Sequence, residues 1–208
     1  MTFQLVNNQL VILPLSDFQV SNFVTNWSCP AESASIPKLN FRFIKRAESK
    51  ISEITYHHYS LNGHKAKFND FLNPDSFKIF EENVKTWVTS VRNLTDLRVN
   101  LGETAVAYGG GEAGLTDRFV GSFMWANKLG LAATYGIKSV MREAVVSSNY
   151  RLIGSDLIPN PDYWITLSFK RLIYKKVLKT QMETNSEYLK VYASTQINNK
   201  RKWLLWAR

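Results

Sequence analysis

The residues with the clearest potential for chemistry lie in one stretch, 101–111, where a carboxylate, a tyrosine and three glycines follow one another closely. Arg98, Val99 and Leu101 are typical of the end of a short buried strand, and Glu103 comes directly after it. A (β/α) barrel presents catalytic groups in this way, and glycines let the backbone approach a ligand closely. The plainer interpretation is a glutamate that caps a strand beside an ordinary glycine turn.

Metal and thiol chemistry have weaker support in the sequence. His57 and His58 are adjacent, and adjacent residues of a strand point to opposite faces, so that even with His64 they do not form a metal-ligand set. Cys29 lies in no pattern typical of a nucleophile, and a single cysteine cannot form an internal disulfide. We therefore expect no metal and no cofactor.

The composition predicts one sizeable core, because 45% of the 208 residues are hydrophobic. The aromatic content of 13% suits either a dense core or surfaces that stack on sugars. No apolar run approaches the roughly 18 residues of a membrane span. The stretch 10–15 is too short for a signal peptide and follows no basic residue, so we expect no signal peptide.

The net charge of +9 is concentrated toward the C-terminus. Residues 170–208 contain ten Lys and Arg against Glu183 and Glu187, a net of +8, whereas residues 1–169 contain 16 basic and 15 acidic groups. Such a block indicates either a solvated face or a site for a polyanion, and composition does not choose between them.

Three strand–helix pairs are predicted between residues 51 and 172. The first strand covers 51–56 and ends where His57 begins, and 61–63 form a turn. Asn73 and Pro74 then cap a helix, with Asp75 at the positive end of its dipole. The apolar residues of this helix recur at intervals that place them on one face, namely Phe77, Phe80, Val84, Trp87, Val88 and Val91.

The second and third pairs follow the same plan. A helix begins near Thr116, the apolar run 137–146 predicts a strand buried on both faces, and Asn160 opens a third helix with the same cap as the first. The residues expected to face inward are Phe119, Val120, Phe123, Met124 and Trp125 in the second helix, and Tyr163, Trp164, Leu167 and Leu172 in the third. This alternation predicts an α/β fold with a parallel sheet, and the pattern at 188–192 predicts a strand of a separate β unit.

A series of short motifs resembles, in order and spacing, the heparanases, which are retaining endo-β-glucuronidases that cleave heparan sulfate. The motifs lie within residues 46–195: Tyr56-His57-His58-Tyr59, Leu61-Asn62-Gly63, Asp70-Phe71-Leu72-Asn73-Pro74-Asp75, Leu101-Gly102-Glu103-Thr104, Ala107-Tyr108-Gly109-Gly110-Gly111, Gly121-Ser122-Phe123-Met124-Trp125, Lys128-Leu129-Gly130-Leu131, Val140-Met141-Arg142, Asn149-Tyr150 and Pro161-Asp162-Tyr163-Trp164. Each motif is weak alone, and the series is specific.

The resemblance implies a partial (β/α)8 TIM barrel that consists of the last three strand–helix units, followed by the start of a β-sandwich side domain. The implied division is an unassigned extension over 1–45, the barrel part over 46–182 and the β-rich part over 183–208. Three of eight units cannot close a barrel, so the outer strands would leave unpaired edges. The first 45 residues could cover one edge, and a companion chain could complete the barrel. The family is lysosomal, or secreted to the extracellular matrix.

The resemblance also implies roles for individual residues. Glu103 matches the catalytic nucleophile. The residues that match substrate contacts are Tyr59, Tyr108, Gly109, Gly110 and Tyr150, of which Tyr108, Gly109 and Gly110 match a loop whose backbone amides bind the glucuronate carboxylate. His64 stands where the family has a basic residue that contacts sulfate, and a neutral imidazole would bind sulfate more weakly. A heparin-binding stretch of the family matches Lys170, Arg171, Lys175, Lys176 and Lys179.

One part of the family's machinery has no match. Its acid/base glutamate lies in an Asn-Glu-Pro stretch, and no Asn-Glu pair occurs in this sequence. Glu112, Asp117 and Glu143 are the nearest spare carboxylates, and no sequence pattern marks any of them as the acid. Two hypotheses follow: a heparanase-like hydrolase that is incomplete as this chain, or a non-catalytic fragment that binds heparan sulfate or another sulfated glycosaminoglycan. No motif supports a nucleic-acid partner.

Overall fold

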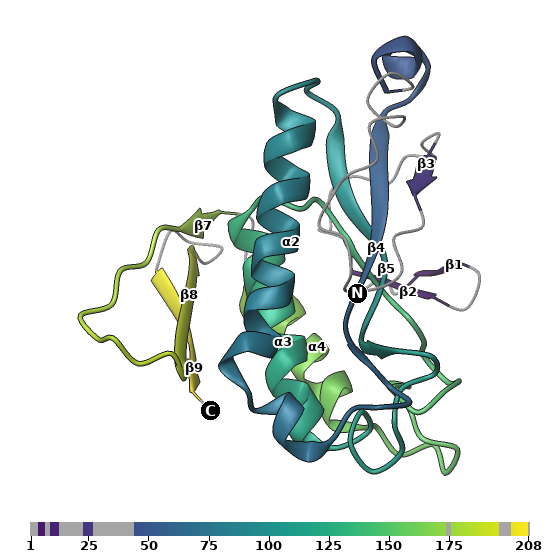
Figure 1. The fold of residues 1–208 in the computed structure, drawn as a ribbon, viewed down its shortest axis with the longest axis vertical. Coiled ribbons are helices and arrows are strands. Elements are labelled where there is room, and N and C mark those ends of the chain that lie inside the picture. The colour runs from purple at the N-terminus through teal and green to yellow at the C-terminus, as the bar shows by residue number, and fades with distance from the viewer. Residues whose placement is uncertain are drawn as a thin grey trace.

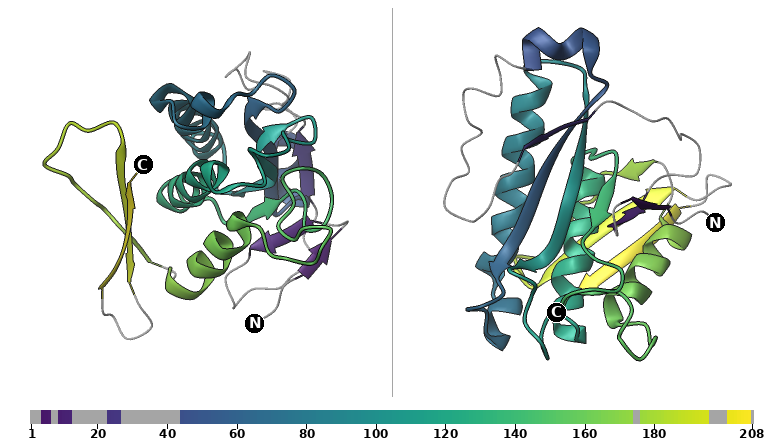
Figure 2. Two further views of the ribbon diagram at one scale, coloured as in Figure 1. Left: turned by 90° about the horizontal axis from the view of Figure 1, so that it is seen from below. Right: turned by 90° about the vertical axis from the view of Figure 1, so that its right-hand side faces the viewer.

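The structure is a computed structural model that describes residues 4–6, 9–12, 23–26, 44–173, 176–195 and 201–207, with side chains for 44–173 and 176–195. Cys29 and Lys175 lie outside this part of the chain. A layer of helices lies between a six-stranded sheet and a three-stranded sheet (Figure 1) (Figure 2). The helices are η1 (Glu48–Lys50), η2 (Phe68–Phe71), α2 (Pro74–Arg92), α3 (Phe119–Thr134) and α4 (Pro161–Leu172). The strands are β1 (Gln4–Val6), β2 (Gln9–Ile12), β3 (Phe23–Asn26), β4 (Glu53–Asn62), β5 (Arg98–Tyr108), β6 (Val140–Arg142), β7 (Val177–Leu178), β8 (Leu189–Thr195) and β9 (Arg201–Ala207).

The large sheet has the strand order β1-β2-β6-β5-β4-β3. Its neighbours β3, β4, β5 and β6 are parallel, whereas β2 is antiparallel to β6 and β1 is antiparallel to β2. Helix α2 connects β4 to β5, α3 connects β5 to β6, and α4 follows β6. The predicted α/β class with a parallel sheet is therefore confirmed, and the three units form an open sheet.

Both edges of the β4–β5–β6 core carry strands from the first 45 residues. Strand β3 pairs with β4 over four residue pairs, from Phe23↔Glu53 to Asn26↔Tyr56. Strand β2 pairs with β6 over three, from Leu10↔Arg142 to Ile12↔Val140. The sequence suggested cover for one edge, and the structure covers both.

Helix α2 forms as its sequence predicts. The Asn73 side chain accepts a hydrogen bond of 3.0 Å from the backbone N–H of Asp75, and Pro74 occupies the first turn. All six predicted core residues of this helix are buried. Trp87 stacks on Tyr56 of β4 with ring centroids 4.8 Å apart, and this contact packs α2 against the sheet.

Helix α3 lies between the two sheets and is buried on most sides. Its Gly130 is in contact with the ring of Tyr192 on β8, because a Cβ there would lie 2.3 Å from that ring. The Tyr192 hydroxyl donates a hydrogen bond of 2.6 Å to Asn127 Oδ1. The prediction for Phe119 is wrong: this residue is the first of the helix, and its side chain is 61% exposed.

Helix α4 departs further from its prediction. Asn160 makes no side-chain cap and instead donates to the backbone oxygen of Arg151. Asp162 does not face solvent at the helix start, because it is buried against Arg142 of β6 at 2.8 Å. Trp164 and Leu172, predicted to face inward, are 55% and 42% exposed. The most buried residues of this helix are the polar Asp162 and Thr166, which an apolar pattern does not include, whereas Tyr163 and Leu167 are half-buried.

The predicted strand ends also need correction. Strand β4 continues through the histidines to Asn62, and Arg98 begins β5 rather than ending it, so Glu103 lies inside a strand. The apolar run 137–146 contains only a three-residue strand, and Val146 is 59% exposed. Strands β4 and β5 continue through polar residues that face the site, and the apolar residues after β6 belong to a loop.

The predicted strand at 188–192 is confirmed as β8, which pairs antiparallel with β7 and β9. Within the described residues these strands form a single sheet, so a second sheet of a sandwich is not among them. Among all the residues that the structure describes, no helix is long and apolar enough to cross a bilayer.

Candidate active site

Strands β4 and β5 bring a tyrosine and a histidine to the carboxylate of Glu103. The Tyr59 hydroxyl donates a hydrogen bond of 2.6 Å to Glu103 Oε1, and His57 Nδ1 lies 3.5 Å from Oε2. His57 pairs directly with Glu103 in the sheet, and Tyr59, two residues along, points to the same face. The Glu103 side chain is 19% exposed, so it is enclosed and still accessible.

The pairing of β5 is irregular on both sides of Glu103. The register with β4 shifts between Tyr56 and His57, and the register with β6 shifts between Leu101 and Thr104. Gly102 lies in this region, and a Cβ there would come within 2.9 Å of Thr55. Bulges of this kind occur next to active sites, where they redirect a side chain.

The protonation states of the neighbours suit an ionised carboxylate. Burial, with the hydrogen bond and charge of Glu103, raises the pKa of Tyr59 far above its usual value, so the phenol keeps its proton. Burial lowers the pKa of His57, and the nearby Glu103 charge opposes that shift only in part. A distance of 2.6 Å is typical of a hydroxyl that donates to an ionised carboxylate.

The glycine loop after β5 meets the ends of the neighbouring strands. Gly109, Gly110 and Gly111 have φ angles of +73°, +85° and +73°, a region that favours glycine. The Gly63 N–H donates to the Tyr108 oxygen at 2.9 Å, and the Asn149 N–H donates to the Gly110 oxygen at 2.8 Å. Backbone hydrogen bonds therefore connect the glycine loop to the turn after β4 and to the segment after β6.

Space for a ligand differs along this loop. A Cβ on Gly109 would lie 2.5 Å from His64 Nε2, so the imidazole packs directly on that glycine. A Cβ on Gly110 would meet no atom within 4 Å. Backbone next to open space is what a loop that binds an anionic group requires.

Tyr150 completes the set of aromatic residues near Glu103. Its ring centroid lies 6.3 Å from that of Tyr59, and the two tyrosines form a small apolar cluster with Ala105 and Ala144. Tyr108 packs against this cluster. The structure thus brings together Glu103 and the predicted residues Tyr59, Tyr108 and Tyr150.

Glu143 is a second carboxylate at this site, and no sequence pattern indicates a role for it. Its backbone N–H donates to the Thr104 oxygen at 3.0 Å. Its charge contributes, after burial, to raising the pKa of Tyr59 and of Tyr150. Its position directly after the end of β6 was the available signal, because residues that follow parallel strands gather at one edge of the sheet.

His57 and His58 face opposite sides of β4, as expected. His57 lies at Glu103, whereas His58 lies against Phe80 of α2, with ring centroids 4.9 Å apart. Among the described residues, no group of three or more His, Cys, Asp or Glu side chains is placed to hold a metal ion.

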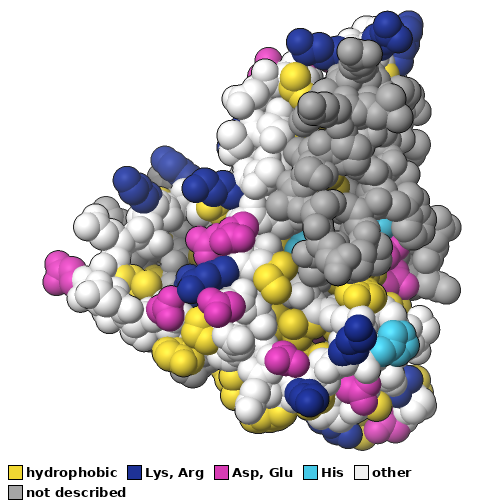
Figure 3. All heavy atoms as spheres, in the orientation of Figure 1, with side chains coloured by type: hydrophobic (Ala, Val, Ile, Leu, Met, Phe, Trp, Pro, Cys, Tyr) yellow, Lys and Arg dark blue, Asp and Glu magenta, His cyan; other side chains and the backbone are white. Residues whose placement is uncertain are grey.

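The predicted heparin-binding residues lie far along the chain from Glu103. Lys170 and Arg171 occupy the last turn of α4, and Lys176 and Lys179 flank β7. Arg171, Lys176 and Lys179 are exposed, while partial burial lowers the pKa of Lys170. Figure 3 shows Lys and Arg side chains gathered over the end of the small sheet that holds β7.

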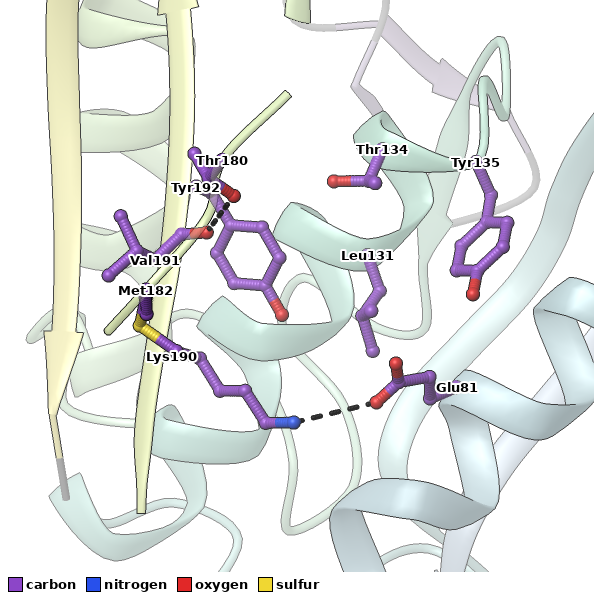
Figure 4. A pocket seen from close by; sticks show the side chains of 9 residues that line it. All are labelled: Glu81, Leu131, Thr134, Tyr135, Thr180, Met182, Lys190, Val191 and Tyr192. Carbon is purple, nitrogen blue, oxygen red and sulfur yellow. Dashed lines mark hydrogen bonds and ion pairs between the residues drawn. The ribbon is translucent and has the colours of Figure 1, made fainter. Parts of the chain in front are cut away.

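A pocket of about 180 Å³ lies apart from these residues, between α2, α3 and the small sheet (Figure 4). Lys190 and Glu81 form an ion pair of 3.5 Å across it. Its lining contains Glu81, Leu131, Thr134, Tyr135, Thr180, Met182, Lys190, Val191 and Tyr192. None of the predicted site residues is among them.

No protein-family model matches the chain. Bovine heparanase is 41% identical over 143 residues, which are 68% of this chain and 26% of that protein. Rat heparanase is 40% identical over 158 residues, which are 74% of this chain and 30% of that protein. A human protein named inactive heparanase-2 is 31% identical over 138 residues, 65% of this chain and 23% of its own length.

Solved structures agree on the fold at lower identity. An arabinofuranosidase has a TM-score of 0.61 and 17% identity, and the match covers 86% of this chain and 41% of that one. The α-L-arabinofuranosidase from Thermotoga maritima has a TM-score of 0.60 and 15% identity, covering 85% and 40%. These neighbours are glycoside hydrolases with TIM barrels, so the open sheet corresponds to part of such a fold. The chain is therefore a sequence relative of the heparanases that spans 26–30% of the length of the bovine and rat proteins.

Proposed function

We propose that this chain is part of a heparanase-like glycoside hydrolase that cleaves β-glucuronidic bonds of heparan sulfate with retention, and that Glu103 is its nucleophile. The observation that carries the proposal is the 2.6 Å hydrogen bond from Tyr59 to a Glu103 carboxylate enclosed on a sheet face. Heparanases at about 40% identity support the substrate class.

In the proposed reaction, the Glu103 carboxylate attacks the anomeric carbon while the bond from that carbon to the leaving oxygen breaks. The leaving oxygen takes a proton from a second carboxyl group, and water then hydrolyses the glycosyl ester with the same group as base. Tyr59 orients the nucleophile through its hydrogen bond, and Tyr150 contacts the sugar.

The glycine loop is proposed to bind the glucuronate carboxylate. Open space beside Gly110 and positive φ angles at Gly109 and Gly110 support this role, since backbone N–H groups can reach an anion there. Tyr108 directly precedes these glycines and packs against the tyrosine cluster. His64 is exposed beside Gly109 and would contact a sulfate more weakly than a permanent cation does.

No residue of this chain is assigned as the acid/base group. Retaining hydrolysis needs a second carboxyl group about 5–5.5 Å from the nucleophile, and the sequence lacks the family's Asn-Glu pair. We propose that further barrel units, in a companion chain or a longer form, provide it. The division at residues 45 and 182, a sandwich beside the barrel, and a lysosomal or extracellular location remain predictions of the same relationship.

A glucuronyl fluoride with a second fluorine at carbon 2 tests Glu103 separately from the missing acid. Fluoride leaves without prior protonation, and the fluorine at carbon 2 slows hydrolysis of the glycosyl ester, so a true nucleophile accumulates as a covalent adduct. The intact mass of the folded protein should increase by one fluoroglucuronyl group, and peptide mapping should place it on Glu103. Glu103→Gln should give no adduct. An unlabelled wild type, or a label on another residue, would show the assignment to be wrong.

A second function, binding of heparan sulfate without cleavage, is favoured by the exposed cations around β7. Arg171, Lys176 and Lys179 are exposed in a region of net charge +8. Binding through them should weaken steeply with salt. Heparin affinity should fall in Lys176→Gln/Lys179→Gln and stay near wild type in a matched pair of exposed lysines, Lys45→Gln/Lys85→Gln. Equal losses in both pairs would indicate binding by net charge alone.

A further inference from the structure

A buried lysine of α3 bonds to the two strands that carry Tyr59 and Glu103. Lys128 is 1% exposed, and its Nζ donates to Thr104 Oγ1 at 2.8 Å, to the Ala105 oxygen at 2.8 Å and to the His58 oxygen at 3.2 Å. Thr104 Oγ1 in turn donates to the His58 oxygen at 2.5 Å. One ammonium group and one hydroxyl therefore connect β4 to β5.

This connection lies on the reverse side of the candidate active site. His58 directly precedes Tyr59, and Thr104 directly follows Glu103, so each contact is one residue from a residue of the site. Neighbouring residues of a strand point to opposite faces. The bonds of Lys128 therefore hold the strands from the helix side, while Tyr59 and Glu103 meet on the other face.

A lysine at this position needs a reason. Burial and the nearby Arg142 lower the pKa of Lys128 well below its usual value, and its Nζ bonds to a hydroxyl and to backbone oxygens. An apolar residue would suit this surrounding better. The register of β5 with β4 shifts between Leu101 and Glu103, and its register with β6 shifts between Leu101 and Thr104. Directly after these irregularities, Lys128 donates to the Thr104 hydroxyl, to the Ala105 oxygen and to the His58 oxygen on β4.

We propose that Lys128, through Thr104, is a positioning residue that fixes the relative placement of β4 and β5 and so maintains the hydrogen bond from Tyr59 to Glu103. The catalytic consequence rests on the proposed function, because it concerns the proposed nucleophile. The placement of β4 and β5 by Lys128 and Thr104 follows from their hydrogen bonds alone.

Thr104→Val is the sharpest test, because it removes the hydroxyl while nearly keeping the shape of the side chain. With the glucuronyl fluoride that carries a second fluorine at carbon 2, we expect the limiting rate of Glu103 labelling to fall about 10- to 100-fold. Misplacement of a reacting group by about 1 Å can cost that much. The concentration for half-maximal rate should change little, because the sugar contacts are retained. Thr104→Ser should restore the rate, and Lys128→Met should lower it at least as much as Thr104→Val.

The matched control is Thr134→Val, which makes the same substitution on α3, where the hydroxyl donates to the Gly130 oxygen of its own helix. It should label at the wild-type rate. A folded Thr104→Val protein with the wild-type labelling rate would overturn the proposal.

A second readout separates this proposal from the function proposed for Glu103. The short hydrogen bond from Tyr59 should give a downfield proton resonance, assigned by its loss in Tyr59→Phe. Thr104→Val should shift this resonance upfield, and Thr104→Ser should not. If wild type is not labelled, the function of Glu103 is wrong and the resonance alone decides the positioning role. An unchanged resonance in Thr104→Val would refute it.

Discussion

Replacing Tyr56 by phenylalanine should stabilise the protein. Tyr56 is fully buried between β4 and α2, and among the described residues its hydroxyl has no hydrogen-bond partner. Burial raises the pKa of Tyr56 far above its usual value, so the group is a neutral hydroxyl with a donor that it cannot use. The ring stacks on Trp87 at 4.8 Å, and phenylalanine would keep that stacking.

The magnitude follows from what the hydroxyl loses on folding. A buried polar group without a partner costs about 1–3 kcal/mol relative to a paired one. Removal of the oxygen leaves a small gap beside the ring, which offsets part of the gain. We therefore expect Tyr56→Phe to raise the free energy of unfolding by about 1 kcal/mol. With a urea dependence of about 2 kcal/mol per molar, the midpoint rises by about 0.5 M.

Tyr192→Phe provides the matched comparison with the opposite sign. The Tyr192 hydroxyl donates at 2.6 Å to Asn127, whose side chain is buried, so its loss leaves the amide oxygen of Asn127 unpaired. The free energy of unfolding should fall by about 1–2 kcal/mol. Urea titrations followed by circular dichroism at pH 7 would measure both variants. A loss of stability in Tyr56→Phe, with an unchanged urea dependence, would refute this reasoning.

Three further predictions follow from burial and charge. Trp87→Ala should lower the free energy of unfolding by about 3–5 kcal/mol, whereas Trp164→Ala, at an exposed position, should change it by less than about 0.5 kcal/mol in the same titration. Burial, and then Lys128, lowers the pKa of His58 well below 6.5, so the stabilisation from neutral His58 is present above pH 6.5 and is lost as pH falls. His58→Asn should therefore flatten the pH dependence of the free energy of unfolding between pH 7 and 5. An unchanged slope would contradict this prediction. Glu143→Gln should lower the pKa of Tyr150, as measured by NMR titration of labelled tyrosine, and an unchanged or raised value would contradict the assigned proximity.

Helix α2 could be predicted from sequence because its signals are local. Asn73, Pro74 and the spacing of the apolar residues all lie within one segment and agree with one another. Helix α4 has the same opening residues, and its prediction failed on the inward face. Asp162 is buried there because Arg142, twenty residues earlier in the sequence, lies opposite it, and a local pattern contains no such information.

The candidate site could be located only in part. The stretch around Glu103 was recognised from residue types, but its contact with Tyr59, 44 residues away, depends on the pairing of β4 with β5. The resemblance to the heparanases matched Tyr59 to a substrate contact, but it did not give this pairing. Lys128 was missed because a single lysine in an apolar helix looks like a surface residue. Only its hydrogen bonds to β4 and β5 in the structure show which groups it contacts.

The strands β2 and β3 have a consequence for assembly kinetics. They occupy the two edges at which further barrel strands would have to join, β2 on β6 and β3 on β4. A second chain could pair with these edges only after the resident strands have left. Association would then be limited by a unimolecular opening step, so that its rate becomes independent of partner concentration at saturation. In this arrangement the N-terminal strands act as competitive occupants of the positions that a closed barrel would need.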